Sequence, residues 1–408
     1  MRILIYGINF APEPTGIGKY TAEMAASLEQ SGCEVRVLTA PMYYPAWKTG
    51  PGFSALCYQV EQSDNVLVTR CPIYVPRRTS GIRRCIHLMS FAISSFAPLM
   101  YLTVSWRPDV IFVVAPSLLC APGAWLAGKF SGARLWLHYQ DLEIDAALAM
   151  KLLPRRGIGW LAKSFERWII RRFDTLSTIS SRMLEKLQAK GVSKQIRLLP
   201  NWVDTLRIKP APRNETMRRR LGIHADAIVA LYSGSINEKS GLETIIESAR
   251  KLSSNSRLTF VVCGDGPARE RIKGVASGLN NVIFLPLQPQ EQFNDLLNIA
   301  DIHLLPQQPG AADLVMPSKL AAILSAGGAV VAAAGAGTEI DCVLNQIEGV
   351  VCASNDASAW APKIEELANN FVGRKEMGER ARHYAIRHFD KDTILTGLAH
   401  QLLNGKAC

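Results

Sequence analysis

Residues 228–241 read IVALYSGSINEKSG, an apolar run of strand length that passes directly into a loop beginning with Gly234. Residues 258–267, LTFVVCGDGP, repeat this plan, with Gly264 and Gly266 in the loop. Strands that alternate with helices are typical of a parallel sheet covered on both faces. Glycines in such turns let backbone N–H groups approach a phosphate, although either turn alone could have only a packing role. Two such turns in succession favour a phosphate-sized pocket.

The same alternation extends over the whole chain. Strands are expected at residues 2–6, 34–39, 65–70, 110–114, 134–139, 174–179, 228–233, 258–263, 282–285, 302–305, 329–333 and 350–352. Helical patterns such as 20–30 and 158–172 lie between them, and a polar, proline-bearing segment interrupts the alternation after Pro200.

We therefore expect an α/β chain with two doubly wound, Rossmann-like domains. The expected parts are a first domain at 1–200 with a basic surface, a hinge at 201–212, a second domain at 213–385 and a C-terminal helical segment at 386–408 that packs back towards the first domain. Ligands of such folds bind at the carboxyl ends of the strands, so the site is expected in a cleft between the facing domains.

The excess positive charge belongs to the first half of the chain. The net charge is +11, and residues 1–200 hold 24 Lys and Arg against 13 Asp and Glu, whereas residues 201–408 hold 22 of each kind. A basic half indicates an anionic partner. We favour the inner face of a membrane or a lipid phosphate and expect no nucleic acid. A soluble protein with a basic face remains the alternative.

The cysteines indicate a reducing compartment. None of the nine forms a C-x-x-C pair, which argues against a zinc site or a redox motif, and 48% hydrophobic residues are enough to build large cores without disulfides. A strand pattern begins at Arg2 with no signal peptide before it. We expect a cytoplasmic protein peripherally associated with the inner membrane.

Residues 85–106 contain no Lys, Arg, Asp or Glu, and four arginines precede them. The length would permit a membrane span, but serines, a threonine and a proline lower the hydrophobicity. We favour a helix that inserts into one leaflet or serves the acceptor site, with a buried helix and a true span as alternatives. Residues 163–172 combine arginines with Phe165 and Trp168, which also suits a headgroup surface.

A third helix start has the chemistry of an anion site. Met316-Pro317-Ser318-Lys319-Leu320 opens a helix, where backbone donors, a hydroxyl and a cation can hold a diphosphate. An ordinary capped helix with a solvated lysine is the alternative. Near the start of the chain, a loop with Gly16 and Gly18 follows the first strand. A dinucleotide cofactor is not expected, because the tight G-x-G-x-x-G and an acidic end to the second strand are both absent.

These motifs, in this order, resemble glycosyltransferase family 4, whose members are retaining enzymes of the GT-B fold. The resemblance spans nearly the whole chain. It rests on the loop at 16–18, Leu199-Pro200-Asn201-Trp202-Val203-Asp204, Tyr232-Ser233-Gly234 with Lys239, Gly264-Asp265-Gly266-Pro267 and Pro317-Ser318-Lys319-Leu320. The opening YGINFAPEPTGIGKY, residues 6–20, is similar to exopolysaccharide enzymes of the colanic acid type within that family.

The resemblance implies a retaining hexosyltransferase that moves a sugar from a nucleotide-sugar donor to a saccharide acceptor linked to a lipid diphosphate. It implies that the domain at 1–200 is the acceptor side, with its basic surface facing the membrane, and that the domain at 213–385 binds the nucleotide sugar. It implies that Gly234 and Lys239 lie by the donor diphosphate with Ser318, Lys319 and Leu320 opposite, that Gly264 and Gly266 shape the nucleoside pocket, and that Gly16 and Gly18 approach the donor from the first domain. The donor is a substrate, and neither a cofactor nor a catalytic metal is expected. Helix N-termini and lysines would stabilise the departing diphosphate.

The chain departs from the family pattern where two glutamates eight residues apart are usual. Leu314 and Ala322 stand at those positions. The neighbouring Asp313 is a possible replacement that only geometry can decide. The arginine that often follows the first loop glycine is Ser235 here. The positive charge at the diphosphate is therefore expected from the two lysines.

A polar cluster, His138-Tyr139-Gln140-Asp141-Leu142, comes at the carboxyl end of the strand at 134–139, where related enzymes often place polar groups beside the reacting sugar. We expect Asp141 to orient or deprotonate an acceptor hydroxyl and His138 to bond a donor-sugar hydroxyl. A helix-capping aspartate and a histidine with its hydrogen bonds satisfied inside the protein are the alternative.

Two other functions remain open from the sequence. A nucleotide-sugar epimerase of similar build needs no separate acceptor, which would leave the basic half and the apolar segment unexplained. A non-catalytic sugar-nucleotide-binding protein would be consistent with the missing glutamates.

Overall fold

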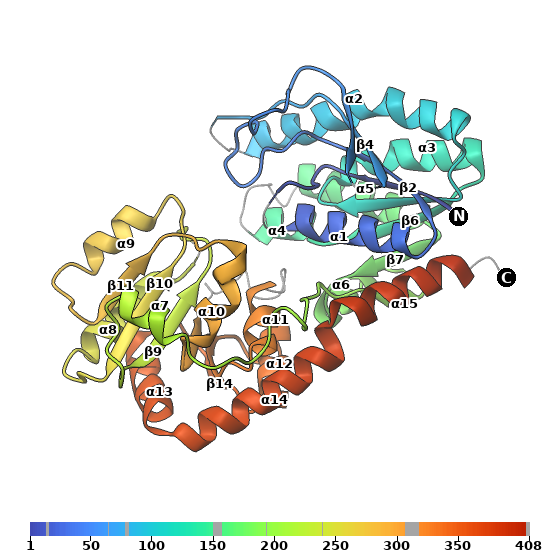
Figure 1. The fold of residues 1–408 in the computed structure, drawn as a ribbon. Helices are drawn as coiled ribbons and strands as arrows, with labels where there is room; N and C mark the ends of the chain where they lie inside the picture. The colour runs from blue at the N-terminus through green and yellow to red at the C-terminus, as the bar shows by residue number, and fades with distance from the viewer. Residues whose placement is uncertain are drawn as a thin grey trace. The chain divides into compact units, whose positions relative to one another are not determined.

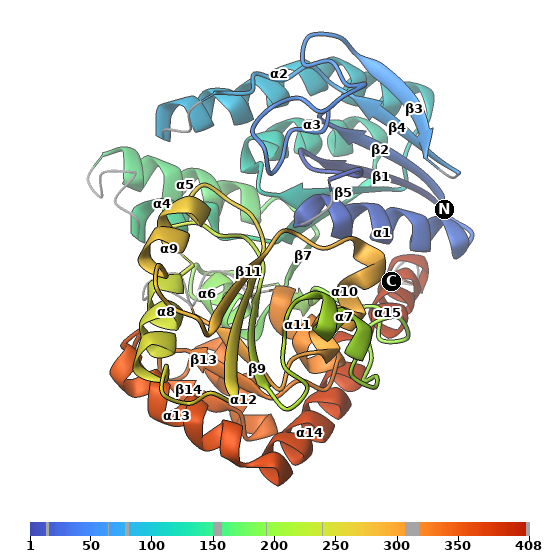
Figure 2. The same ribbon diagram turned by 60° about the vertical axis from the view of Figure 1, so that its left-hand side comes forward.

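In a computed structural model, the chain divides into two compact units. Unit 1 comprises Met1–Pro200 and Asp392–Cys408, and unit 2 comprises Asn201–Lys391. The structure describes residues 1–13, 16–63, 65–77, 81–149, 157–192, 194–238, 240–306 and 318–404. Each unit is a mainly parallel sheet with helices packed around it (Figures 1 and 2). The expected α/β class with two doubly wound domains is confirmed.

The sheet of unit 1 has the order β3-β4-β2-β1-β5-β6-β7-β8. Its strands are β1 (Arg2–Gly7), β2 (Glu34–Thr39), β3 (Gln59–Ser63), β4 (Val66–Arg70), β5 (Val110–Ala115), β6 (Arg134–Tyr139), β7 (Thr175–Thr178) and β8 (Ile196–Leu198). The neighbouring strands are parallel, except that β3 is antiparallel to β4. β1 lies between β2 and β5, so the strand order reverses there, which is where ligands of doubly wound folds bind.

The helices of unit 1 pack around this sheet. They are α1 (Ile17–Gln30), α2 (Gly81–Ser105), α3 (Ala121–Ser131), α4 (Glu143–Ala149), α5 (Ile158–Ile170), α6 (Ser181–Gln188) and α15 (Lys391–Asn404). The last helix returns to unit 1, where Arg134 Nη2 donates a hydrogen bond of 3.1 Å to the Leu402 carbonyl. Every residue of β5 is buried, as expected of a central strand covered on both faces.

The sheet of unit 2 has the order β11-β10-β9-β12-β13-β14 and is parallel throughout. Its strands are β9 (Ile228–Ser233), β10 (Leu258–Cys263), β11 (Val282–Leu285), β12 (Ile302–Leu305), β13 (Val330–Ala333) and β14 (Val350–Cys352). Its helices are α7 (Glu215–Arg220), α8 (Leu242–Lys251), α9 (Arg269–Val275), α10 (Phe293–Asn298), α11 (Ser318–Ser325), α12 (Glu339–Ile347), α13 (Ala357–Asn369) and α14 (Phe371–Phe389). Here the order reverses at β9.

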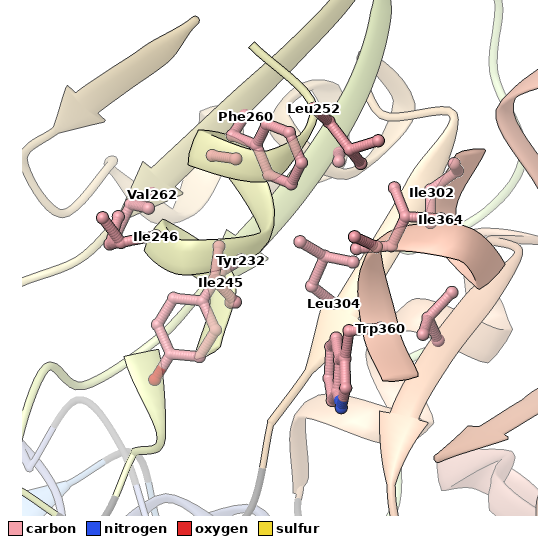
Figure 3. Packing of buried hydrophobic residues seen from close by; sticks show 14 of the residues in the cluster. Tyr232, Ile245, Ile246, Leu252, Phe260, Val262, Ile302, Leu304, Trp360 and Ile364 are labelled. Carbon is pink, nitrogen blue, oxygen red and sulfur yellow. The ribbon is translucent and has the colours of Figure 1, made fainter. Parts of the chain in front are cut away.

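Alternation along the strands builds two cores in unit 2. Phe260 and Val262 of β10 point to the core under α8 and α13, whereas Val261 between them points to the core on the opposite face. Figure 3 shows Ile245 of α8 and Trp360 of α13 within the first of these cores. Full burial of one large aliphatic or aromatic side chain contributes roughly 1.5–3 kcal/mol, so the two cores hold the carboxyl ends of β9 and β10 firmly.

All strands expected from the sequence are present, and two further strands were not expected. β3 has the polar sequence QVEQS and lies at the sheet edge, with a neighbouring strand on one side only. β8 has only three residues. Neither strand carries an apolar run, because an edge strand need not be buried on both faces.

Candidate active site

The side chain of Lys319 in α11 lies against the glycine that follows β9. A Cβ built on Gly234 would meet Lys319 Cε at 2.2 Å and Nζ at 2.3 Å. Gly234 also has φ +145°, a conformation that residues with side chains rarely adopt. The backbone conformation therefore favours glycine here, and a side chain at this position would also displace the end of Lys319.

Tyr232 holds the lysine ammonium in place. Lys319 Nζ donates a 2.9 Å hydrogen bond to Tyr232 Oη and lies 4.4 Å from the ring centroid. Tyr232 Oη in turn donates to the Ser235 carbonyl at 2.6 Å. An ammonium has three donors, and among the described residues Tyr232 is its one hydrogen-bond partner, so donors remain for an anionic ligand.

The loops after β9 and β10 are pressed together backbone to backbone. The Gly234 N–H donates to the Cys263 carbonyl at 2.9 Å, and the Ile236 N–H donates to the Asp265 carbonyl at 2.8 Å. A Cβ on Gly264 would lie 1.8 Å from the Gly234 carbonyl oxygen, which is closer than any side chain permits. The structure thus brings the two predicted glycine loops together beside Lys319.

The helix that carries Lys319 begins at Ser318, so its positive N-terminal end lies at the same side of unit 2. Leu320 is fully buried and serves the core of the unit. Position 322 holds a buried alanine, which supplies no carboxylate. Lys239, Asp313 and Leu314, which the sequence analysis considered, lie outside the described residues.

In unit 1, the loop after β1 buries a carboxyl group. Glu13 accepts hydrogen bonds from Asn9 Nδ2 at 3.2 Å and 3.0 Å, and its Oε1 also accepts from the Tyr44 N–H at 3.3 Å. A Cβ on Gly18 would lie 2.5 Å from Glu13 Oε2. Glu13 thus occupies the space that a side chain at position 18 would need, which favours glycine there. Burial raises the pKa of Glu13 to about 7, against the opposing effect of the Asn9 hydrogen bonds.

Gly16 lies at the start of α1 with φ +75°, the left-handed region that favours glycine. A Cβ there would lie 3.6 Å from Tyr44 Cε1, which is an ordinary contact. The backbone conformation thus requires glycine at this position. The predicted approach of Gly16 and Gly18 to the donor stays a prediction.

Two more carboxyl groups follow β6, the second strand from β1. Burial raises the pKa of Asp141 to about 6 and that of Glu143 to about 7, and the positive charge of Arg84 in α2 opposes both shifts. The Leu118 N–H, in the turn that follows the intervening β5, donates a long 3.5 Å hydrogen bond to Glu143 Oε2. The loops after β1, β5 and β6 therefore form one polar edge with three carboxyl groups.

His138 is enclosed in the sheet and is not part of that edge. Its Nδ1 lies 2.9 Å from Ser177 Oγ, and its Nε2 lies 3.0 Å from Gln140 Nε2. Burial lowers the pKa of His138 to about 3, so the ring is neutral at physiological pH. Both ring nitrogens have protein partners, as in the alternative that the sequence left open, and the catalytic roles of His138 and Asp141 stay predictions.

The sequence patterns indicate no active-site role for the side chains of Glu13, Glu143, Arg84 or Tyr232. A signal existed for the carboxyls, because Glu143 stands two residues after Asp141 and Glu13 lies in the glycine loop itself. No sequence pattern showed that a tyrosine inside β9 would hold a lysine from a helix 87 positions later. Among the described residues, no group of three or more His, Cys, Asp or Glu side chains is placed to hold a metal ion.

Comparison with known proteins shows the family to which this chain belongs. Residues 15–202 match the model described as "Glycosyl transferase 4-like domain", and residues 213–384 match "Glycosyl transferases group 1". The chain belongs to the family 4 glycosyltransferases of the GT-B fold, and it is a glycosyltransferase. It is 41% identical over 407 residues to the putative colanic acid biosynthesis glycosyl transferase WcaI of Escherichia coli (strain K12), with 97% of this chain and 98% of that relative covered.

Solved structures agree on the fold. Sucrose-phosphate synthase (tll1590) from Thermosynechococcus elongatus has a TM-score of 0.75 at 17% identity, with 100% of both chains covered. Anabaena Alr3699/HepE, solved in complex with UDP and glucose, has a TM-score of 0.71 at 15% identity, with 99% of both chains covered. These findings give no support to the epimerase or to the non-catalytic alternative.

Proposed function

We propose that unit 2 binds a nucleotide-sugar donor with its diphosphate against Lys319, the Gly234 loop and the N-terminal end of α11. The observation that carries this proposal is the position of Lys319 Nζ, hydrogen-bonded to Tyr232 Oη and pressed on Gly234 at the carboxyl end of β9. A cation and a helix N-terminus together favour a dianion. Glycine loops pressed together leave no side chain over the backbone, which permits close approach of a phosphate.

Two relatives support a nucleotide-sugar donor and a saccharide product. Alr3699/HepE, which shares the fold, was solved with UDP and glucose. The relative that covers nearly the whole chain is described as a putative colanic acid biosynthesis enzyme. We propose that this protein likewise extends an exopolysaccharide of the colanic acid type, and that its acceptor is a saccharide carried on a lipid diphosphate.

The proposed chemistry is transfer with retention of the anomeric configuration. The bond between the anomeric carbon and the phosphate oxygen breaks, and its electron pair leaves with the nucleoside diphosphate. The acceptor hydroxyl oxygen bonds to the anomeric carbon, and its proton passes to the departing diphosphate. Negative charge therefore grows on the phosphate, and an ammonium group already held in place stabilises it without reorganisation. This arrangement requires no divalent ion.

A layer of helices on unit 1 supports a membrane-facing role. Among the described residues, α2 is the one helix that is long and apolar enough to cross a membrane by length and composition. Apolar side chains at helical spacing are exposed along it: Ile82, Ile86, Met89 and Ile93. The opposite face is buried through Phe91 and Leu99. A helix with one face packed on its unit is suited to lie in the membrane surface.

The neighbouring helices extend this surface. Gly123 of α3 packs close to Leu99 of α2, since a Cβ there would lie 3.4 Å from the leucine Cδ2. Trp125 of α3 meets Trp168 of α5 at 5.6 Å between ring centroids. α5 exposes Trp160 and carries basic residues, with Arg172 placed 3.9 Å over the Trp168 ring centroid just after it. Aromatic and basic side chains together are typical of headgroup-level contacts.

Nucleotide release tests the donor proposal. UDP-sugars and GDP-sugars are offered with and without membrane extract, and the wild type is compared with Lys319→Ala and Lys273→Ala. Lys273 is an exposed lysine of the same unit, paired with Glu270 at 3.2 Å. We expect extract-dependent release by the wild type and Lys273→Ala and a loss of at least 100-fold in Lys319→Ala. Equal release by both variants would contradict the proposal.

Vesicle sedimentation tests the membrane proposal separately. Phosphatidylglycerol-containing vesicles are expected to bind the wild type, whereas phosphatidylcholine vesicles bind it weakly. Trp160→Asp and Ile93→Asp should each reduce binding, because a charge replaces an exposed apolar contact. Leu287→Asp is the matched control in unit 2, since Leu287 and Trp160 are exposed to 62% and 63%. Binding that is equal in all variants would refute the surface.

A further inference from the structure

An aromatic loop in unit 1 adjoins the three carboxyl groups. Tyr43 and Trp47, in the loop after β2, meet edge to face at 5.6 Å between ring centroids. Trp47 has φ +50°, an unusual conformation for a bulky residue. Such backbone conformations cost roughly 1–3 kcal/mol and concentrate at functional sites. Tyr44 beside them is 39% exposed, so one aromatic face of the loop is open to a ligand.

Tyr44 ties this loop to the carboxyl groups. Its N–H donates to Glu13 Oε1 at 3.3 Å. Burial raises the pKa of the Tyr44 phenol, the negative charges of Asp141 and Glu13 add to this shift, and Arg84 opposes it. Burial, together with the negative charges of Glu13 and Glu143, raises the pKa of the Tyr43 phenol. The loops after β1, β2 and β6 thus bring aromatic rings and carboxyl groups together at one edge of the sheet.

Buried polar atoms without partners accompany these rings. His87 of α2 is buried against Tyr43 at 4.6 Å and Trp47 at 5.2 Å between ring centroids. Its Nδ1 lies 2.6 Å from the Tyr74 carbonyl oxygen, but its Nε2 has no hydrogen-bond partner among the described residues. Thr39 Oγ1, at the end of β2, is also buried without a described partner. Buried polar atoms of this kind indicate water or a ligand.

The chemistry of this edge favours a neutral polyhydroxyl ligand. Arg84 and Arg70 lie near the three carboxyl groups, and Arg70 is already paired with Glu61. The remaining negative charge repels a phosphate, whereas carboxyl oxygens accept hydrogen bonds from sugar hydroxyls. Because burial raises the pKa values of Glu13 and Glu143 to about 7, each carboxyl is partly protonated near neutral pH and can also donate a hydrogen bond. Tyr44 and Trp47 supply apolar surface for the C–H face of a pyranose ring.

We propose that Glu13, Asp141 and Glu143, with the aromatic loop of Tyr44 and Trp47, form the subsite for a neutral pyranose ring of the acceptor saccharide. This inference rests on the proposed glycosyl transfer and adds where unit 1 holds the accepting sugar. Glu13 is a positioning residue, because its carboxylate fixes the Tyr44 backbone and packs on Gly18. Tyr44 and Glu143 contact the sugar.

Kinetics with two variants test this subsite. The half-saturating amount of membrane extract and the half-saturating concentration of the nucleotide sugar are measured for the wild type, Tyr44→Ala and Glu143→Gln. Both variants should raise the half-saturating amount of membrane extract roughly tenfold, because the loss of one hydrogen bond or stacking contact weakens binding about tenfold. The half-saturating concentration of the nucleotide sugar should stay unchanged. Glu185→Gln, which removes an exposed carboxylate of unit 1 paired with Arg182, is the matched control.

The outcomes separate this inference from the proposed function. An unchanged half-saturating extract in both variants, or a donor value that rises equally, overturns the subsite. Failure of the proposed function looks different, because the wild type itself would then release no nucleotide from any UDP-sugar or GDP-sugar. Circular dichroism and thermal unfolding of each variant confirm that the compared proteins are folded.

Discussion

Lys319 fills the space that a Cβ on Gly234 would occupy, with its Nζ only 2.3 Å from that position. The lysine comes from the helix after β12 and the glycine from the loop after β9, and these strands are neighbours in the sheet. The pair therefore places a positive charge directly on a bare backbone at the reversal of strand order, where doubly wound domains bind their ligands.

Gly234→Ala should damage donor binding beyond the cost of its backbone strain. The new methyl group collides with the end of Lys319, and alanine adopts φ +145° only with backbone strain. We therefore expect a loss of about 1–3 kcal/mol in the free energy of unfolding and at least tenfold weaker donor binding. Gly278→Ala is the control, since Gly278 has φ +80° but no atom within 4 Å of its Cβ position. Urea unfolding and nucleotide titration measure both effects, and equal results for the two variants would contradict this account.

Tyr232→Phe should release the lysine without removing its charge. The variant loses the 2.9 Å bond from Lys319 and the 2.6 Å bond to the Ser235 carbonyl. We expect a donor half-saturation about threefold to tenfold higher and a stability loss on the order of 1 kcal/mol. Tyr384→Phe, a tyrosine of α14, is the control. A donor half-saturation that matches the wild type would mean that Tyr232 does not position Lys319.

Glu13→Gln should change the pH dependence of stability. The folded-state pKa of Glu13, about 7, exceeds its ordinary value of 4.5, so the folded state binds a proton that the unfolded state has lost between these values. This contribution favours the folded protein below about pH 4.5 and disappears as the pH rises to about 7, a change of up to about 3 kcal/mol. Asn9, Tyr43, Tyr44 and Arg70 surround the group and are unchanged in the variant.

Urea unfolding of both proteins between pH 4.5 and 8 measures this difference. The wild type should lose more stability than Glu13→Gln over that range. Parallel pH profiles would show that the carboxyl is ionised in the folded state as easily as in the unfolded chain.

Removal of divalent ions should leave turnover intact. In the proposed chemistry, Lys319 and the N-terminal end of α11 stabilise the leaving diphosphate, so excess EDTA is expected to change the rate of nucleotide release less than twofold. Magnesium added back serves as the control for general salt effects. A loss of most activity in EDTA that magnesium restores would show that a metal carries this charge.

The fold was accessible from the sequence because buried parallel strands are apolar on both faces. β2, β6, β9, β10 and β12 begin and end as their apolar runs indicate. Because β9 and β10 end where predicted, the loops that begin at Gly234 and Gly264 also lie where the sequence indicates. The edge strand β3 was missed, because alternating polar residues at a sheet edge resemble a loop.

The side-chain arrangement was only partly accessible. The Pro-Ser-Lys-Leu motif indicated a helix start at Lys319, but not the contact of Lys319 with Tyr232, which depends on where the tertiary fold brings α11 relative to the end of β9. The sequence suggested His138 as a catalytic residue from its position at a strand end, whereas the register of β6 and β7 places Ser177 against its ring. Glycine patterns indicated the loop at 16–18 but not that Glu13 fills the space beside Gly18.

The affinity of unit 2 for a nucleoside diphosphate tests the central claim most directly. Isothermal titration of UDP and GDP into the wild type, Lys319→Ala and Lys273→Ala gives the three dissociation constants for whichever nucleotide the wild type prefers. Loss of a charge-assisted contact to a phosphate should weaken binding by Lys319→Ala roughly tenfold to 100-fold and leave Lys273→Ala unchanged. Equal affinity in all three proteins, or no binding of either nucleotide by the wild type, would contradict the claim that Lys319 and the Gly234 loop form the diphosphate site.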